Sequence, residues 1–247
     1  MAGQALTGKG QVERAGSVGP DASWGRLFTA GGWAAALYVF LILVPLVLVL
    51  LAPVPPTEGA ALLDYIAAHQ AVYLVELVCF VGLAVPALVV FSAVAVSLKG
   101  VDKSVAAIGG LFGVASEVIA LALGSSPQSL HGGLVVLSNS YAGGGGGADR
   151  TGLVGAADAL IAATNAVSWA GILTAAAILL LSSVMRRAAF FGPVIGTIGM
   201  IAGILGIASE ALRPLIGPAY LVYGLLLPTW FALVGWKLLH LDRQRSS

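Results

Sequence analysis

Six apolar runs dominate this chain, and each is long enough to cross a lipid bilayer as a helix. They cover residues 33–52, 72–98, 105–123, 153–184, 190–210 and 218–239. The hydrocarbon core of a bilayer is about 30 Å thick, which takes about 20 residues of α-helix. A helix also satisfies its own backbone hydrogen bonds in lipid. The runs therefore predict an all-α fold, a polytopic membrane helix bundle with six transmembrane helices.

The scarcity of charge supports the same interpretation. Only 9% of the 247 residues are charged and 59% are hydrophobic, with a mean hydropathy of +0.99. A soluble domain carries about a quarter charged residues, so this chain has too few to cover a surface that faces water. The lipid bilayer is therefore the expected partner, and the net charge of +1 argues against nucleic acid. A single cysteine, Cys79, excludes a disulfide within the chain.

Basic residues set the expected orientation of the six helices. Ten of the twelve lysines and arginines fall at the N-terminus, in the second and fourth connections, or at the C-terminal end. They are Lys9, Arg14, Arg26, Lys99, Lys103, Arg186, Arg187, Lys237, Arg243 and Arg245. The other connections hold only Arg150 and Arg213. Because basic residues accumulate on the cytoplasmic side, we expect a multi-pass protein whose N-terminus and C-terminus are both cytoplasmic.

The segments outside the six runs are short. We expect a flexible cytoplasmic tail over residues 1–27, a six-helix transmembrane domain over 28–240 and a second cytoplasmic tail over 241–247. The longest connection, 124–152, is predicted to be a flexible, Gly-rich outer loop, because it holds five consecutive glycines at 143–147. It lacks the preceding strand and the following Lys-Ser/Thr of a phosphate loop.

Two of the apolar runs nearly repeat each other, and each contains a Ser-Glu pair. Residues 109–119 read GGLFGVASEVI, and residues 202–212 read AGILGIASEAL. Aligned without gaps, 108–119 and 201–212 share six identities, the Ser-Glu pair among them. A parallel duplication of a two-helix unit explains this likeness. Chance similarity between two helices rich in Gly, Ala and Ile is the alternative.

Glycines precede each Ser-Glu pair at spacings of three and four residues, which place them on one face of a helix. The helix-packing glycines are Gly110 and Gly113 in the first run, and Gly196, Gly199, Gly203 and Gly206 in the second. Small residues let helices approach closely, so we expect Glu117 and Glu210 to continue faces that pack against protein. These Gly-rich faces are also where a second copy or other membrane subunits are expected to bind.

Glu117 is the deepest acid of the predicted bundle, about 18 Å from the inner boundary at 1.5 Å per residue. A carboxylate at the centre of a bilayer costs about 2.5–3.5 kcal/mol, so Glu117 has to be protonated, paired or next to water. Two interpretations stay open: an interhelical hydrogen bond, and a carboxylate that responds to a proton, a cation or a ligand. For Glu210 we favour an ion pair with Arg213, one turn away, although Arg213 can instead reach Glu117.

The outer half of the predicted bundle is acidic, with seven acids against two bases. The acids are Glu58, Asp64, Glu76, Glu117, Asp149, Asp158 and Glu210. This bias predicts an outward-facing acidic cavity that attracts cations or holds water. The candidate ligand- or ion-binding residues are Glu117, Glu76, Asp158, Asn165, Glu210 and Arg213.

No catalytic or metal site is recognisable in the sequence. The three histidines, His69, His131 and His240, lie at helix ends or in loops, unlike the paired helix histidines of a haem site. No Cys/His cluster suggests zinc, and there is no Gly-x-Ser-x-Gly elbow. We therefore expect no catalytic residue, no metal and no cofactor, and an enzymatic role is disfavoured.

Three stretches resemble an uncharacterised family of small bacterial six-helix membrane proteins. They read GRLFTAGGWAAALYVFLIL from residue 25, DKSVAAIGGLFGVASEVIALAL from residue 102 and SSVMRRAAFFGPVIGTIGMIAGILGIA from residue 182. The resemblance covers about residues 25–240 and is diffuse. It implies six helices and a bacterial cytoplasmic membrane, and it carries no activity or functional residue. The five glycines of the outer loop are not part of it.

Three functions compete on this basis. The first is a small transporter or a ligand- or ion-binding membrane protein with Glu117 at the centre of an outward-biased acidic cavity. The second is a non-catalytic accessory or scaffold subunit of a larger membrane complex, which fits the scarcity of chemistry and the glycine faces. The third is a membrane enzyme that acts on lipid or quinone. What Glu117 contacts discriminates best among them.

Overall fold

The computed structural model describes residues 21–48, 50–126, 130–144, 147–166, 168–216 and 220–243. Within these ranges the chain is helical and forms no strand, apart from one isolated bridge between Ser125 and His131. The helices are α1 (Gly25–Leu48), α2 (Gly59–Ala68), α3 (Gln70–Gly82), α4 (Ala84–Leu98), α5 (Lys103–Leu123), α6 (Gly132–Ala142), α7 (Gly147–Asn165), α8 (Trp169–Met185), α9 (Pro193–Ala211), α10 (Arg213–Ile216) and α11 (Tyr220–Arg243), with a 3-10 turn at Ala22–Trp24.

Six helical stretches of the described chain are long and apolar enough to cross a membrane, which confirms the predicted fold class. They are Gly25–Leu48, Gln70–Leu98, Lys103–Leu123, Asp149–Met185, Pro193–Ala211 and Val222–Leu241. Two of them consist of two helices each, because α3 is followed by α4 and α7 by α8. The chain is therefore a six-span membrane protein by the length and composition of its helices.

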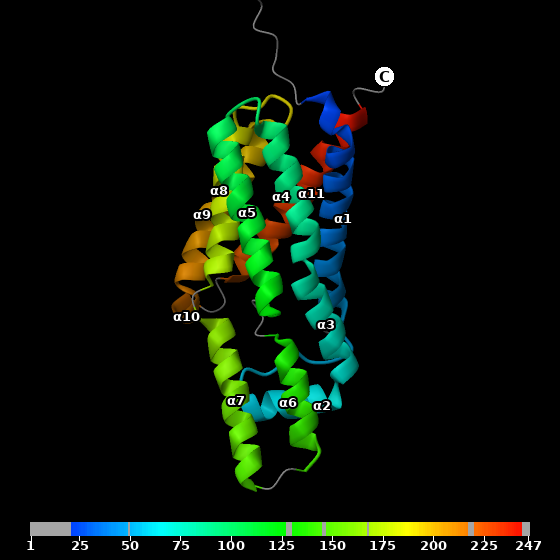
Figure 1. The fold of residues 1–247 in the computed structure, drawn as a ribbon, viewed down its shortest axis with the longest axis vertical. Helices are drawn as coiled ribbons and strands as arrows, with labels where there is room; N and C mark the ends of the chain where they lie inside the picture. Colours follow the sequence, from blue (N-terminus) through cyan, green and yellow to red (C-terminus); the bar gives the residue numbers. More distant parts are fainter. Residues whose placement is uncertain are drawn as a thin grey trace, which may run out of the picture.

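The helices form two parts that lie one below the other in Figure 1. The upper part, which we call the bundle, contains α1, α4, α5, α8, α9 and α11, and its far end holds the start of α1 and the end of α11. The lower part, which we call the cap, contains α2, α6 and α7, with α2 lying crosswise to α6 and α7 partway along their length. Helix α2 packs on both α6 and α7, while α3 connects the cap to the bundle.

Each part has its own apolar core. The bundle core includes an aromatic cluster in which Tyr38 of α1 stacks on Phe231 of α11 and Phe91 of α4 meets the edge of Phe231. The cap core combines aliphatic residues such as Leu63 and Leu134 with two buried tyrosines, Tyr65 and Tyr73. Many other large apolar side chains of the bundle are exposed on the outside, where lipid is expected to cover them.

The glycine stripes lie against helices of the same chain. A side chain at Gly110 or Gly113 of α5 would meet α4, at Ala95 and at the ring of Phe91. The four glycines of the second stripe, Gly196, Gly199, Gly203 and Gly206, face α8, and two of them also contact α11. The close packing predicted from these spacings is thus used within the chain, and binding of a partner through the same faces stays a prediction.

The connection 124–152, expected to be a loop, contains α6 and the start of α7. Helix α6 forms because His131 caps its first turn, with Nδ1 accepting a hydrogen bond from the Gly133 N–H at 2.9 Å. It is held on α2 by Leu134 in the cap core and by Ser138, whose Oγ donates to the Leu63 carbonyl at 2.7 Å. Of the five glycines, residues 145–146 lie outside the described residues, as does most of the 1–27 tail.

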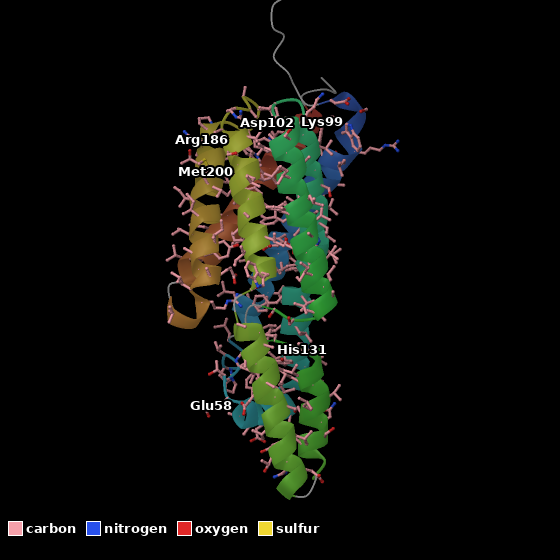
Figure 2. All side chains as sticks on the ribbon, turned by 60° about the vertical axis from the view of Figure 1, so that its left-hand side comes forward. Glu58, Lys99, Asp102, His131, Arg186 and Met200 are labelled. Atoms are coloured by element: carbon pink, nitrogen blue, oxygen red, sulfur yellow. The ribbon has the colours of Figure 1, made fainter. Side chains whose placement is uncertain are left out.

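Figure 2 shows Lys99, Asp102 and Arg186 together at the end of the bundle that lies away from the cap, and Glu58 and His131 in the lower half. At that end Lys99 pairs with Asp21 and Arg187 with Asp102, at 3.2 and 2.9 Å. Hydrogen bonds that Asp21 accepts from the Ser23 backbone N–H, the Ser23 hydroxyl and Lys99 lower the pKa of Asp21 to about 2. Lys99, Arg186 and Arg187, which were predicted to share one side of the membrane, thus lie at one end of the fold. Which compartment that end faces stays a prediction.

Candidate functional site

A cavity of about 360 Å³ lies where the bundle meets the cap. Several helices break or end beside it. Helix α5 ends at Gly124 in a left-handed conformation (φ 55°), and α7 ends at Asn165 before α8 begins at Trp169. Helix α3, in contrast, continues into α4 through Leu83, whose backbone is itself α-helical. Because only glycine adopts a positive φ readily, Gly124 lets α5 stop there. The broken helices leave space that packed side chains fill elsewhere in the bundle.

The cavity wall is mainly apolar, with polar groups that converge on it. The apolar wall comes from Phe80, Val81, Leu83, Ala84, Ile119, Ala120, Leu123, Ala163, Ala166, Trp169, Ala170, Gly171 and Leu227. The polar groups are Tyr38, Ser116, Glu117, Ser125, Ser126, Thr164, Ser168, Thr174, Glu210, Arg213 and Tyr223. Apolar walls with a few placed polar groups are typical of small-molecule sites.

Glu117 projects from α5 into this cavity and is only 8% exposed. Its Oε1 accepts hydrogen bonds from the hydroxyls of Ser116 and Thr174, each at 3.3 Å. Each hydroxyl carries a single hydrogen, and each also lies closer to a backbone carbonyl, at 2.7 Å for Ser116 and 3.1 Å for Thr174. The two donors are therefore shared with the backbone. No basic side chain of the described chain lies within 4 Å of this carboxyl group.

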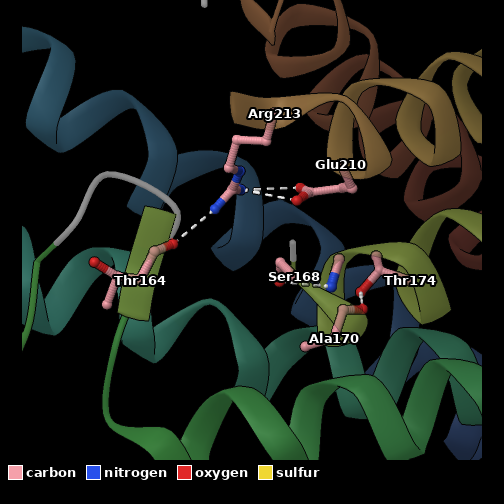
Figure 3. A network of polar contacts seen from close by, with 7 residues as sticks. Thr164, Ser168, Ala170, Thr174, Glu210 and Arg213 are labelled. Carbon is pink, nitrogen blue, oxygen red and sulfur yellow. Dashed lines mark hydrogen bonds and ion pairs between the residues drawn. The ribbon is translucent and has the colours of Figure 1, made fainter. Parts of the chain in front are cut away.

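Glu210 of α9 is in a different electrostatic environment, although it borders the same cavity. It is 1% exposed, and its carboxylate pairs with the Arg213 guanidinium at 2.9 Å through Oε2 and 3.1 Å through Oε1. The same guanidinium donates to the Thr164 carbonyl, near the end of α7, at 3.0 Å. Figure 3 shows Arg213 between these two groups. The ion pair predicted from the sequence is present, and Arg213 does not reach Glu117.

The first turn of α8 also faces Glu210. Ser168 caps this helix, because its hydroxyl accepts a hydrogen bond from the Gly171 N–H at 3.1 Å (Figure 3). Gly171 has no side chain, and the Glu210 carboxyl group occupies the place where a Cβ would lie. The N-terminal end of a helix carries a partial positive charge. Glu210 is thus compensated twice, by Arg213 and by the start of α8.

Three of the six candidate residues lie apart from this cavity or outside the description. Asp158 of α7 accepts a hydrogen bond from the Gly59 N–H at 2.8 Å, so it stabilises the start of α2 within the cap. Glu76 of α3 is buried, and its Oε2 has no hydrogen-bond partner among the described residues, but it does not line the cavity. Asn165 ends α7, and its side chain lies outside the described residues. The structure therefore brings together Glu117, Glu210 and Arg213.

Several polar residues of the cavity were not anticipated. Thr174 belongs to α8, which meets α5 only in three dimensions, so no local spacing pointed to it. Ser126 follows α5 by three residues, in the connection that was expected to be a flexible loop. Ser126 is 4% exposed, and its hydroxyl has no partner among the described residues. The single helix expected over 153–184 is divided at 166–168, and here a local signal existed: Ser168 precedes an apolar run, as an N-cap residue does.

Comparison of the chain with family models, with curated proteins and with solved structures finds no match. The family resemblance noted in the sequence therefore stays a prediction, and the function is inferred from the cavity itself.

Proposed function

We propose that the chain is a solute-binding membrane protein of the transporter kind, and that the cavity between the bundle and the cap is its binding site. The observation that carries this proposal is the position of Glu117. Its buried carboxyl group lines a cavity of about 360 Å³ and has two long, shared hydrogen bonds, with no countercharge among the described residues. A buried ionisable group inside a membrane protein is a functional candidate when it borders such a space.

The size and the lining of the cavity support the proposal. Small-molecule sites have volumes of about 300–1,000 Å³ and apolar walls with a few polar groups. The hydroxyl of Ser126, which has no partner among the described residues, and the carboxyl group of Glu117 give a bound solute two acceptors. Such groups are costly to bury unless a ligand or water completes their hydrogen bonds.

The interrupted helices give a second line of support. Transporter sites are commonly built where transmembrane helices are discontinuous, because the free ends of the half-helices supply polar groups inside the membrane. Here α7 and α8 meet at such an interruption beside the cavity, and α5 ends beside it at Gly124. The cap lies against one end of the bundle, so movement of the cap is a direct way to open and close this space.

A cavity-filling substitution tests the proposal. Ala120→Trp places an indole in the cavity, whereas Ala122→Trp, two residues further along α5, places it on the exposed outside of the helix. The purified protein is titrated with four solutes that share a phenyl ring and differ in charge: 2-phenylethylammonium, 3-phenylpropionate, phenylalanine and 2-phenylethanol. We expect at least one to raise the thermal unfolding temperature of the native chain and of Ala122→Trp, but not of Ala120→Trp. A solute effect that Ala120→Trp retains in full would contradict a site in this cavity.

A further inference from the structure

We propose that the solute of this cavity is a monovalent organic cation with an apolar body, whose charged group is bound by Glu117 and Ser126. The inference deepens the function proposed above and rests on it. It is carried by the charge balance of the cavity, by an acceptor that has no partner among the described residues, and by the apolar wall.

The described lining residues carry one negative charge in excess when they are ionised. They include two carboxylates, Glu117 and Glu210, and one guanidinium, Arg213. In the sequence, residues 127–129, 167 and 217–219, which lie outside the described residues, are all uncharged. A bound monocation makes this set neutral, whereas an anion adds a second uncompensated charge.

The excess charge belongs to Glu117 and not to Glu210. Arg213 binds the Glu210 carboxylate through both oxygens, and the first turn of α8 faces the same group. An anionic solute would have to compete with Glu210 for this guanidinium. Glu117 receives only two hydroxyl contacts of 3.3 Å, so a cationic solute meets a carboxylate that has no rival cation among the described residues.

Ser126 gives an observation that is independent of charge. Its side chain lines the cavity, is 96% buried and has no hydrogen-bond partner among the described residues. Its oxygen can accept a hydrogen bond from an ammonium group. Each N–H of a buried ammonium group needs a hydrogen-bond acceptor. The Glu117 carboxylate and the Ser126 hydroxyl are two such acceptors that line the same cavity.

The rest of the lining favours an organic body over a bare metal ion. Inorganic cations bind several oxygen ligands at short range, and the described residues hold no group of three or more metal-binding side chains. Instead the wall includes Phe80, Leu83, Ile119, Leu123 and Trp169. Apolar surface of this kind stabilises the carbon skeleton of a solute, and aromatic rings attract cations as well.

Charged thiol reagents test the inference without knowledge of the natural solute. Ala120→Cys in a Cys79→Ser background places one thiol in the cavity, and Ser140→Cys in the same background places one on the exposed surface of α6. The probes are three methanethiosulfonates: a trimethylammonium-ethyl cation, a sulfonatoethyl anion and an uncharged methyl reagent. Each rate is divided by the rate of the same reagent with 2-mercaptoethanol in solution.

We expect the cation to react faster than the anion at residue 120 by about tenfold or more, since a charged cleft concentrates its counterion to that degree. At residue 140 the preference is expected to be much smaller. Glu117→Gln removes most of the preference at residue 120, and 2-phenylethylammonium protects the thiol better than 2-phenylethanol or 3-phenylpropionate. Ser126→Ala weakens this protection and provides a second variant should Glu117→Gln fail to fold.

The outcomes separate the two proposals. A residue-120 thiol that reacts readily with the uncharged reagent but shows no cation preference, or one that Glu117→Gln leaves unchanged, overturns the cation assignment and leaves the cavity site standing. Equal protection by the anion or by the neutral solute overturns it as well. A thiol that none of the three reagents reaches overturns the proposed function together with the inference, because no solute can then enter.

Discussion

The two Ser-Glu regions of this protein have nearly the same local sequence and different surroundings. Both follow glycines that let their helices pack closely, both are buried, and both border one cavity. At Glu210, a guanidinium and a helix N-terminus compensate the carboxylate. At Glu117, the partners are two hydroxyls that the backbone also uses.

The difference comes from one position in the sequence. Three residues after Glu210 stands Arg213, while three residues after Glu117 stands Ala120. Residues three apart on a helix share a face. Glu210 therefore has a countercharge beside it, whereas Glu117 has the small side chain of Ala120 and the open cavity beside it. Two similar segments can therefore hold a structural ion pair and, as we propose for Glu117, a binding group in the same fold.

The largest effect is expected from removing the countercharge of Glu210. Arg213→Gln leaves a buried carboxylate without its partner and detaches the end of α7, so we expect a loss of about 3–5 kcal/mol of stability. Thermal unfolding of the purified protein, followed by tryptophan fluorescence, measures it. Adding Glu210→Gln to this variant should restore most of the loss. A double variant as unstable as Arg213→Gln alone would show that the pair is not what stabilises this region.

Filling the space beside Glu210 is expected to have a smaller effect. Gly171→Ala places a methyl group where the Glu210 carboxyl group lies, and this group is held by Arg213 and cannot easily move. We expect a loss of about 1–3 kcal/mol, as for other overpacked positions. Gly155→Ala on α7, where no atom lies within 4 Å of the added methyl, is the matched control. It should be neutral or slightly stabilising because alanine favours the helix.

Ala120→Arg makes the first region resemble the second. The new guanidinium lies three residues after Glu117 and can pair with it across the cavity edge. We expect 2-phenylethylammonium to bind about tenfold more weakly, which corresponds to about 1.4 kcal/mol. Ala120→Gln, which adds length without charge, should weaken binding less. Equal effects of the two variants in a calorimetric titration would indicate that bulk, and not charge, is responsible.

Neutralising Glu117 is expected to change stability very little. The amide of Glu117→Gln keeps an oxygen that accepts from Ser116 and Thr174, and no partner cation is left unpaired among the described residues. We expect the stability to stay within about 1 kcal/mol of the native protein, while the preference for cations is lost. A collapse comparable to that of Arg213→Gln would mean that Glu117 also has a structural role.

The smallest effect is expected from an exposed pair at the other end of the bundle. The Val105 N–H and Arg187 lower the pKa of Asp102, so its stabilising contribution is present above the ordinary value of 3.8 and is lost as the pH falls towards the lowered value. Asp102→Asn keeps a capping side chain but removes the charge. Its unfolding temperature should be slightly below that of the native protein at pH 7 and should converge with it in acid. A constant difference across this range would exclude the ionised carboxylate as the cause.

The sequence was sufficient for the features that depend on local spacing. The six spans follow from the length of the apolar runs, and the Glu210–Arg213 pair follows from its three-residue separation. The glycine stripes were also placed on packed faces, although their neighbours are helices of the same chain.

Features that depend on tertiary contacts could not be predicted. Asp158 was expected near Glu117, but it caps α2, because the connection between α1 and α3 brings the start of that helix to α7. Thr174 meets Glu117 only because α5 packs on α8. The glycine run suggested a loop and masked the apolar pattern of α6, whose burial depends on α2. Long-range contacts of this kind produce no periodic pattern of residues that could be recognised in the sequence.

Carbodiimide labelling tests the contrast between the two glutamates most directly. Dicyclohexylcarbodiimide is an apolar reagent that modifies carboxyl groups in apolar surroundings when no cation holds them. Mass spectrometry of the digested protein then gives the extent of modification at each glutamate. Our account predicts that Glu117 is modified, that Glu210 is protected, and that Arg213→Gln exposes Glu210 to the reagent. Modification of Glu210 in the native protein to the same extent as Glu117, or an unreactive Glu117, would contradict it.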